Sequence, residues 1–302
     1  MNAREVSEVV VVSGKGGTGK TTVSASLALL SPEAVVTDCD VDAANLSLLL
    51  RSVVVETHEF SGVAKARIDE SKCSSCGVCR EVCRFGAAHP PQVDDILCEG
   101  CGLCARLCPT QAIGMHAGVS GQWYVSKTMW GPMIHARLEP GGDNSGMLVT
   151  AVRGRARELC LSEGRSLIIT DGPPGIGCPV ISSLSGADLA LLVAEPTLSG
   201  LHDLERAMEV CRRLDVRTAV CINKYDLNLD NSDQIRSMAS ETSPVVGLIP
   251  YDEAVPRAMA EGWPVVTTGG RAARAIADMW SELQESVFGI ASASRRTFAV
   301  GP

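Results

Sequence analysis

The sequence predicts an α/β protein built on a mainly parallel sheet, with a small cysteine-rich insertion. Apolar β-branched runs alternate with helical patterns along most of the 302 residues, and this alternation is typical of a parallel sheet covered by helices on both faces. A glycine-rich loop, GKGGTGKT, separates the first apolar run from the first helical pattern. The alternation stops between about residues 57 and 120, where Gly, Pro, Ser and Cys become more frequent.

Each apolar β-branched run is expected to be a strand, and each stretch with helical periodicity a helix. The predicted strands are residues 5–13, 34–38, 121–128, 133–139, 166–171, 187–195, 217–223 and 243–250. The predicted helices are residues 20–30, 43–50, 146–162, 201–214 and 271–287. Residues 60–119 are expected to form the insertion, so the host domain comprises residues 1–59 and 120–302.

Composition and charge exclude several classes of function. The net charge of −8 and the isoelectric point near 5.2 argue against a general nucleic-acid-binding protein, which normally presents a basic face. The N-terminus lacks the features of a signal peptide, and no run of about 18 apolar residues predicts a membrane span. We therefore expect a cytoplasmic protein without integral membrane association. In such a reducing compartment, clustered cysteines indicate metal ligands before disulfides.

The glycine-rich loop indicates a phosphate-binding site. Residues 14–21 fit the pattern G-x-x-x-x-G-K-[ST] and stand between a predicted strand and a predicted helix. Glycines allow backbone N–H groups to curl around phosphate oxygens, and the helix N-terminus adds a partial positive charge. We expect Lys20 to reach the terminal phosphates and Thr21 to bind Mg²⁺.

A second lysine, Lys15, directly follows Gly14. With it, the loop resembles those of the MinD-superfamily, deviant Walker A P-loop ATPases, which include MinD, ParA, Mrp/NBP35-type proteins and the nitrogenase iron protein. The resemblance implies a homodimer, or a heterodimer of paralogous chains, with the nucleotides sandwiched between subunits. It also implies that Lys15 crosses the interface to the partner's nucleotide and acts in catalysis with Lys20.

Two acidic segments match the switches of the same family. The segment TDCDVDAANL (37–46) resembles switch I, and the resemblance assigns Asp40 to the attacking water and to Mg²⁺. The segment IITDGPPGIG (168–177) resembles switch II, in which Asp171 at a strand end is expected to hold the Mg²⁺ water shell. The residues Pro173, Pro174 and Gly175 then form a turn that could sense the γ-phosphate.

The nucleotide base is expected to lie near residues 222–226, INKYD. The resemblance assigns Asn223 to the adenine edge and places Pro250 in a loop beside the base. However, N-K-x-D is also the guanine-reading motif of GTPases, so Asp226 leaves GTP open while Lys15 favours ATP. The expected nucleotide-binding residues are Gly14, Lys15, Gly16, Gly17, Thr18, Gly19, Lys20, Thr21, Thr22, Asn223 and Pro250. The expected Mg²⁺ residues are Thr21, Asp40 and Asp171.

The insertion contains two cysteine runs, CSSCGVCREVC (73–83) and CEGCGLCARLC (98–108), that share C-x-x-C-x-x-C-x-x-x-C spacing. This is the bacterial ferredoxin pattern for two [4Fe–4S] clusters, in which the fourth cysteine of each run serves the other cluster. Four cysteines can also hold zinc, but zinc modules usually have paired halves with a longer spacer. The expected ligands are Cys73, Cys76, Cys79 and Cys108 for one cluster, and Cys98, Cys101, Cys104 and Cys83 for the other. The first run has Arg84 where proline usually follows, which removes no ligand.

Five cysteines remain, and four of them are expected to be small buried residues. Cys178 differs because it lies seven residues after Asp171. A cysteine at this interval in the nitrogenase iron protein ligates a cluster that bridges its dimer. That protein supplies two such ligands per subunit, and no convincing second one is found here. The hypothesis is that Cys178 contacts a transient metal or cluster at the dimer interface, and a buried thiol is the alternative.

The host and the insertion together predict an iron–sulfur ATPase of α/β fold with an inserted α+β ferredoxin module. We expect Mg·ATP hydrolysis and dimer switching to be coupled to electron transfer, or to metal or cluster assembly, on a redox or metalloprotein partner. Two alternatives stay open. The protein could be a redox carrier whose nucleotide site only regulates docking, or a MinD-like organiser on a membrane, which would need a basic amphipathic C-terminal helix.

Overall fold

The computed structural model describes residues 6–139, 142, 145–239 and 243–288. The chain forms two compact units. The first comprises Met1–Thr57, Trp123–Arg137 and Gly146–Pro302, and the second comprises His58–Gln122 and Leu138–Ser145. The insertion predicted at residues 60–119 falls inside the second unit.

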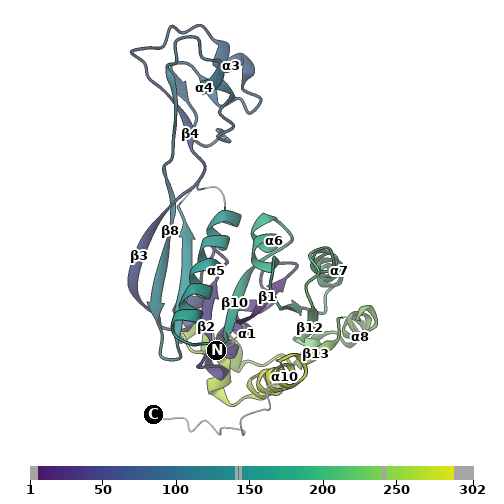
Figure 1. The fold of residues 1–302 in the computed structure, drawn as a ribbon. Helices are drawn as coiled ribbons and strands as arrows, with labels where there is room; N and C mark the ends of the chain where they lie inside the picture. The colour runs from purple at the N-terminus through teal and green to yellow at the C-terminus, as the bar shows by residue number, and fades with distance from the viewer. Residues whose placement is uncertain (1–5, 140–141, 143–144, 240–242, 289–302) are drawn as a thin grey trace. The chain divides into compact units, whose positions relative to one another are not determined.

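The first unit is built on a nine-stranded sheet (Figure 1). Its strand order is β13-β12-β11-β1-β10-β2-β9-β8-β3. The strands are β1 (Ser7–Ser13), β2 (Val35–Asp38), β3 (Val53–Ser61), β8 (Val119–Lys127), β9 (Pro132–Leu138), β10 (Leu167–Pro174), β11 (Leu189–Ala194), β12 (Thr218–Asn223) and β13 (Val245–Ile249). All neighbours from β13 to β9 pair in parallel, which confirms the predicted, mostly parallel sheet. The sequence did not predict β3.

Helices cover both faces of this sheet, as expected for continuous apolar strands. On one face, α1 (Lys20–Leu30) and α10 (Arg271–Phe288) pack against the odd-numbered residues of β1, such as Val9 and Val11. On the other face, α6 (Cys178–Leu184), α7 (Leu198–Arg213) and α8 (Leu229–Met238) pack against Val10 and Val12. Successive residues of a strand point to opposite faces, so β1 contributes side chains to the hydrophobic core on each face of the sheet.

Three further α-helices belong to the described part of the first unit. The helix α5 (Ser145–Ser162) follows β9, and its buried residues include Leu148, Val152 and Ala156. The short α2 (Leu46–Leu49) follows β2, and α9 (Ala254–Ala260) follows β13. Among the described residues, no helix combines the length and apolarity that crossing a membrane requires.

The second unit is a small α+β structure. It contains two antiparallel strand pairs, β4 (Lys65–Ile68) with β7 (Ile113–His116) and β5 (Ala88–His89) with β6 (Gln92–Val93). Two five-residue helices, α3 (Val78–Val82) and α4 (Leu103–Leu107), each begin after a glycine of positive φ. Those glycines, Gly77 at 81° and Gly102 at 73°, stand at the same place in the two cysteine runs. The sequence duplication is therefore a structural duplication.

Candidate functional site: a phosphate loop and two cysteine pockets

The phosphate loop connects β1 to α1, and its glycines are required by its shape. Gly17 and Gly19 have φ of 81° and 96°, values that favour glycine. A Cβ on Gly19 would collide with the Asn223 amide, and a Cβ on Gly14 would collide with Asp203. The Asn223 side-chain nitrogen donates to the Thr18 carbonyl oxygen at 2.7 Å, which ties the end of β12 to the loop. Asn223, assigned above to the base, therefore also braces the loop.

Lys20 and Asp171 lie together beneath the loop. Lys20 is buried, and Asp171 accepts a hydrogen bond from the Ser24 hydroxyl at 2.8 Å. Burial raises the pKa of Asp171 to about 6, although the Thr21 hydroxyl, Lys20 and Ser24 oppose the shift. Thr21 and Asp171, the residues predicted for Mg²⁺, are thus neighbours, and a divalent cation bound there would favour the ionised carboxylate.

A second buried carboxylate, Asp38, is close to the first. It accepts the backbone N–H groups of Asp40 and Leu46, each at 3.1 Å. Burial and the neighbouring charge of Asp171 raise its pKa well above the ordinary value. Burial also raises the pKa of Asp40, and the ammonium of Lys20 offsets part of that effect. The arrangement gathers three carboxyl groups, two of which interact with Lys20, and carboxyl oxygens are the ligands that a hard cation prefers.

A cleft opens in front of these groups, with an empty volume of about 2090 Å³ that includes solvent space at its mouth. Its phosphate end is lined by the glycine loop, Asp40 and the Pro173–Pro174 turn, and its other end by Asn223 and Pro250. Apolar side chains from α2 and α9 also line the cleft: Leu48, Leu49, Val255, Pro256 and Met259. Of the predicted residues, nine line this cleft: Gly16, Gly17, Gly19, Lys20, Thr21, Thr22, Asp40, Asn223 and Pro250. Asp171 is buried behind it, whereas Gly14, Lys15 and Thr18 line a different, smaller pocket.

The residues that follow Asn223 make contacts within the chain. Lys224 forms an ion pair with Glu195 at 2.7 Å. One carboxylate oxygen of Asp226 accepts the backbone N–H of Tyr251 at 2.7 Å, and so holds the loop that carries Pro250. Asp226, which in the GTPase motif reads guanine, thus has a structural contact here.

Lys15 does not point into the cleft of its own chain. Its ammonium donates to the hydroxyls of Thr197 at 2.9 Å and Ser199 at 3.0 Å, and lies 3.6 Å from Glu195. Thr197 also caps the N-terminus of α7 by accepting the Gly200 N–H. Lys15 is therefore held at the β11–α7 loop, on the part of the surface where Leu198 is 79% exposed.

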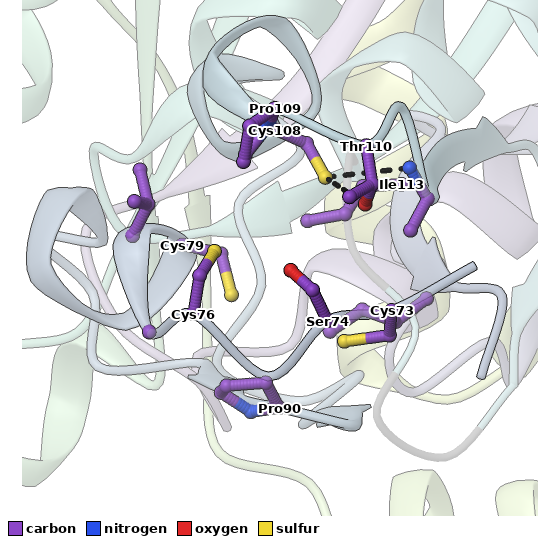
Figure 2. A pocket seen from close by; sticks show the side chains of 13 residues that line it. Cys73, Ser74, Cys76, Cys79, Pro90, Cys108, Pro109, Thr110 and Ile113 are labelled. Atoms are coloured by element: carbon purple, nitrogen blue, oxygen red, sulfur yellow. Dashed lines mark hydrogen bonds between the residues drawn. The ribbon is translucent and has the colours of Figure 1, made fainter. Parts of the chain in front are cut away.

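The eight clustered cysteines line two pockets in the second unit. Cys73, Cys76, Cys79 and Cys108 surround the first (Figure 2), and Cys83, Cys98, Cys101 and Cys104 surround the other. These are the two crossed sets expected from the ferredoxin spacing. The crossing arises because α3 carries Cys79 and is followed at its end by Cys83, while α4 carries Cys104 and is followed by Cys108. All eight are free thiols.

The two crossing cysteines share one environment. The backbone N–H of Ala87 donates to the Cys83 sulfur, and that of Ala112 to the Cys108 sulfur, each at 3.3 Å. Burial raises the pKa of Cys83, but several backbone N–H groups outweigh it and the net shift is downward. The Thr110 hydroxyl and the Ala112 N–H lower the pKa of Cys108. Both loops thus favour a thiolate, the form that ligates metals.

No group of three or more His, Cys, Asp or Glu side chains within the described ranges is arranged to hold a metal ion. Cys178, the ninth cysteine of interest, is exposed and begins α6, directly after the switch II segment. The other four cysteines, Cys39, Cys160, Cys211 and Cys221, are buried, which confirms their assignment as core residues.

Some residues of the site were missed by the sequence reasoning. Ser24, one turn into α1, was not among the predicted site residues, because a serine inside a helix belongs to no recognisable motif. Its hydroxyl nevertheless donates a hydrogen bond to Asp171. Glu195 and Thr197 were absent because contacts with Lys15 span about 180 residues of sequence. The sequence signal that could have found them is position, since both lie within three residues of the end of β11 and the strand ends of a parallel sheet meet at one edge.

Comparisons with known proteins agree with this geometry. Residues 9–265 match the family model described as the CobQ/CobB/MinD/ParA nucleotide binding domain. An uncharacterized protein of Methanocaldococcus jannaschii, MJ0578, is 33% identical over 292 residues, covering 93% of this chain and 98% of the relative. Septum site-determining protein MinD of Helicobacter pylori is 27% identical over 120 residues, covering 36% of this chain and 45% of that protein.

Solved structures show the same fold at low identity. MinD of Pyrococcus horikoshii, complexed with Mg-ADP, has a TM-score of 0.59 and 18% identity, covering 93% of this chain and 96% of that one. A chain of the MinC:MinD cell division protein complex of Aquifex aeolicus has a TM-score of 0.57 and 19% identity, with coverage of 96% and 99%. The ATP complex of Cyanothece McdA(D38A) has a TM-score of 0.56 and 16% identity, with coverage of 96% and 99%.

Proposed function

This chain belongs to the CobQ/CobB/MinD/ParA nucleotide-binding domain family, and on that premise we propose that it is an iron–sulfur ATPase. It binds and hydrolyses Mg·ATP and couples the nucleotide state to electron transfer, or to metal or cluster assembly, on a partner protein. One observation carries the proposal. The same polypeptide holds a phosphate loop and two pockets whose four-cysteine sets follow the crossed ferredoxin pattern.

The nucleotide half of the proposal assigns roles to residues around the cleft. Lys20 neutralises the terminal phosphates, and Asp40 positions the attacking water. Thr21, Asp40 and Asp171 are the residues that hold Mg²⁺, which supplies further charge neutralisation. Lys15 acts across a dimer, in which it leaves its contacts with Thr197 and the neighbouring loop. The dimer forms between identical or paralogous chains.

The purine in this proposal is adenine. Asp226 uses one carboxylate oxygen to hold the Tyr251 N–H, and Lys224 is paired with Glu195. Both contacts occupy groups that a guanine-reading site would turn toward the base. Competition of unlabelled ATP and GTP against a fluorescent ATP analogue tests this assignment, and GTP displacing the probe as well as ATP would contradict it.

The cluster half rests on the chemistry of the two pockets. Each offers four thiols in a largely apolar lining, together with backbone N–H groups directed at the crossing cysteine. A single zinc ion gathers its ligands around one centre, whereas the iron atoms of a cube take thiolates at separate corners. The C-x-x-C-x-x-C-x-x-x-C spacing in the sequence is that of [4Fe–4S] ferredoxins, whereas zinc modules usually have paired halves with a longer spacer. The clusters would supply reversible one-electron storage.

Anaerobic purification followed by iron and sulfide counting tests the cluster half. We expect about eight irons per chain, because two [4Fe–4S] clusters contribute four each. Cys101→Ser should lower iron content, whereas Cys160→Ser, at a buried cysteine outside the pockets, should not. Colourless, iron-free wild-type protein would contradict the proposal.

Steady-state ATPase rates with the clusters oxidised and reduced then separate the coupled enzyme from a redox carrier with a merely regulatory nucleotide site. The coupled enzyme hydrolyses ATP at a rate that depends on cluster state. A carrier binds nucleotide with negligible turnover in both states.

A MinD-like spatial organiser is the second candidate, because solved MinD structures share the fold. The apolar face of α10, which such a role would use at a membrane, instead packs into the core through Ile276, Met279, Trp280 and Leu283. Sedimentation with anionic liposomes in the presence of Mg·ATP decides the matter. ATP-dependent co-sedimentation supports the organiser, and its absence supports the iron–sulfur enzyme.

Cys178 is proposed to contact a metal or cluster across the dimer, since it is exposed beside the switch II segment. Cys178→Ser should then reduce the metal content of the ATP-bound dimer while monomer metal content stays constant. Equal metal content in both states would leave Cys178 as an ordinary surface thiol.

A further inference from the structure

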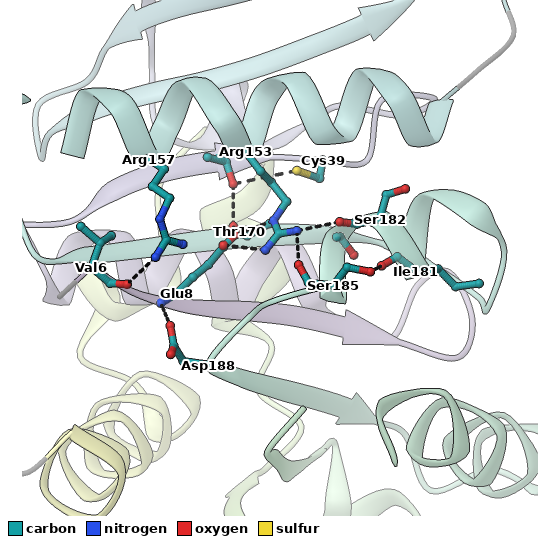
Figure 3. A network of polar contacts seen from close by, with 12 residues as sticks. Val6, Glu8, Cys39, Arg153, Arg157, Thr170, Ile181, Ser182, Ser185 and Asp188 are labelled. Atoms are coloured by element: carbon teal, nitrogen blue, oxygen red, sulfur yellow. Dashed lines mark hydrogen bonds and ion pairs between the residues drawn. The ribbon is translucent and has the colours of Figure 1, made fainter. Parts of the chain in front are cut away.

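A buried ion pair lies on the face of the sheet opposite α1. Glu8 on β1 and Arg153 on α5 have side chains that are only 3% and 12% exposed. The Arg153 Nε and Nη2 groups donate to the two carboxylate oxygens of Glu8 at 2.8 and 2.7 Å (Figure 3). This two-bond geometry fixes the guanidinium plane, which a lysine could not reproduce.

The remaining side of Arg153 faces α6. Its Nη1 group donates to the carbonyl oxygens of Ser182 at 2.7 Å and Ser185 at 2.8 Å, at the C-terminal end of that helix. The N-terminal end of α6 is close to the start of α5, because a Cβ on Gly146 would lie 3.5 Å from the Cys178 carbonyl oxygen. The helix that directly follows the switch II segment is therefore held along α5, chiefly by one arginine.

Glu8 also reaches the strands that bear the acidic residues of the cleft. Its Oε1 atom accepts the Thr170 hydroxyl at 2.7 Å, and the Thr170 oxygen accepts the Thr37 hydroxyl at 2.8 Å. Thr170 and Thr37 immediately precede Asp171 and Asp38. Because side chains alternate along a strand, the threonines occupy one face of the sheet and the carboxylates the other. One network of hydrogen bonds thus connects the ends of β10 and β2 with the helix α6.

We propose that Arg153 is a positioning residue for nucleotide hydrolysis. By bridging Glu8 and the end of α6, it sets the position of the switch II segment relative to the acidic strand ends. Through the same contacts α5 supports α6. The helix α5 is also where the chain re-enters the first unit. The kinetic part of this inference rests on the proposed ATPase function, whereas the structural part does not.

The variant Arg153→Lys tests the bridge. Lysine keeps a positive charge for Glu8 but cannot serve both carboxylate oxygens and both carbonyls. We expect kcat for ATP to fall by about tenfold or more while KM changes by less than about twofold, because switch II is displaced without loss of ground-state binding. Arg157→Lys, on the same helix, is the matched control, since the hydrogen bond of Arg157 within the described part of the chain is a long one, 3.5 Å to the Val6 carbonyl oxygen. The control should retain wild-type kcat.

Hydrogen exchange provides a readout that does not depend on activity. In Arg153→Lys, peptides covering residues 171–184 should exchange faster than in wild type, while peptides from β1 and α10 exchange as before. Uniformly faster exchange across the first unit would mean that Arg153 only stabilises the fold, and would overturn the proposal. Wild-type protein without ATPase activity would refute the proposed function. The exchange result would still show whether Arg153 holds α6 and the switch II segment in place.

A second variant tests the proposal if Arg153→Lys does not fold. In Glu8→Leu/Arg153→Met the buried pair is replaced by apolar side chains, an exchange that buried ion pairs often tolerate without loss of stability. Since this variant also lacks the bridge to α6, its kcat and its exchange at residues 171–184 should match those of Arg153→Lys. Wild-type kcat in the folded double variant would overturn the proposal.

Discussion

A single buried histidine should make the stability of this protein depend on pH between about 4 and 6.5. His135 on β9 is only 9% exposed, its Nε2 atom lies 2.9 Å from the Ser126 hydroxyl, and its ring stacks on Tyr124. Burial lowers its pKa from 6.5 to about 4. The native protein therefore keeps His135 neutral at pH values where the unfolded chain has already protonated it.

The size of the effect follows from the two pKa values. Between pH 6.5 and 4 the unfolded state binds more protons at this position, so the free energy of unfolding falls as the pH falls. Because one pKa unit corresponds to about 1.4 kcal/mol, the full loss is about 3 kcal/mol, reached near pH 4. Above pH 6.5 His135 contributes no pH dependence. The buried carboxyl groups of Asp38 and Asp171 act in the opposite direction, because their raised pKa values favour the native state as the pH falls.

His135→Gln isolates the histidine, because glutamine can keep a hydrogen bond to Ser126 but does not titrate. Urea unfolding followed by tryptophan fluorescence at pH 7.5, 6.0 and 4.5 gives the free energy of unfolding for both proteins prepared identically. Wild type should lose about 2–3 kcal/mol more than the variant between the first and last pH, while contributions from carboxyl groups cancel. His89→Gln, at an exposed histidine, should follow wild type. Parallel pH profiles for wild type and His135→Gln would refute the reasoning.

Four further outcomes follow from the site. Asp171→Asn should weaken Mg²⁺-dependent ADP binding by about 10–100-fold, measured by calorimetry, with Mg²⁺-free binding unchanged; equal loss in both conditions would contradict a Mg²⁺ role. Lys15→Ala should lower kcat by about 100-fold while the ADP affinity of the monomer, measured by fluorescence titration, stays constant. Gly19→Ala should abolish nucleotide binding, because its φ of 96° and the nearby Asn223 amide exclude a Cβ. Cys76→Ser should remove about half of the iron, and retention of all iron would place Cys76 outside the ligand set.

The core elements were predictable because their hydrophobic patterns are unambiguous. Residues 166–171 and 217–223 are apolar runs of strand length that contain β-branched residues, and both form strands. The sequence did not predict β3, where Val53, Val54 and Val55 are 70%, 46% and 52% exposed. Three adjacent exposed valines at the edge of a sheet give no alternation of buried and exposed positions. Only the neighbouring β8 makes that segment a strand.

The residues of the candidate site also fall into a group that could be predicted from the sequence and a group that could not. The two cysteine runs are contiguous motifs, and the two sets that their spacing predicted are the sets that line the two pockets. The phosphate loop is also contiguous, but its residues line two different pockets. The contacts of Lys15 and the pairing of Glu8 with Arg153 join residues far apart in the chain. A glutamate inside an apolar strand does require a cation partner, but no local pattern could have selected Arg153 among the arginines of α5.

The edge strands of the large sheet limit which residues can be deleted to remove the second unit. β9 has Met133, Ile134 and Ala136 fully buried and pairs with β2 in a register that places His135 beside Asp38. Its protection on the outer side comes from β8 and then β3, and both of these strands contain the points where the chain passes between units. Excising residues 58–122 would remove the first part of β8 and the last part of β3, and would leave unsatisfied backbone groups next to the switch I strand. The shortened chain should therefore aggregate through that exposed sheet edge unless a replacement hairpin covers it.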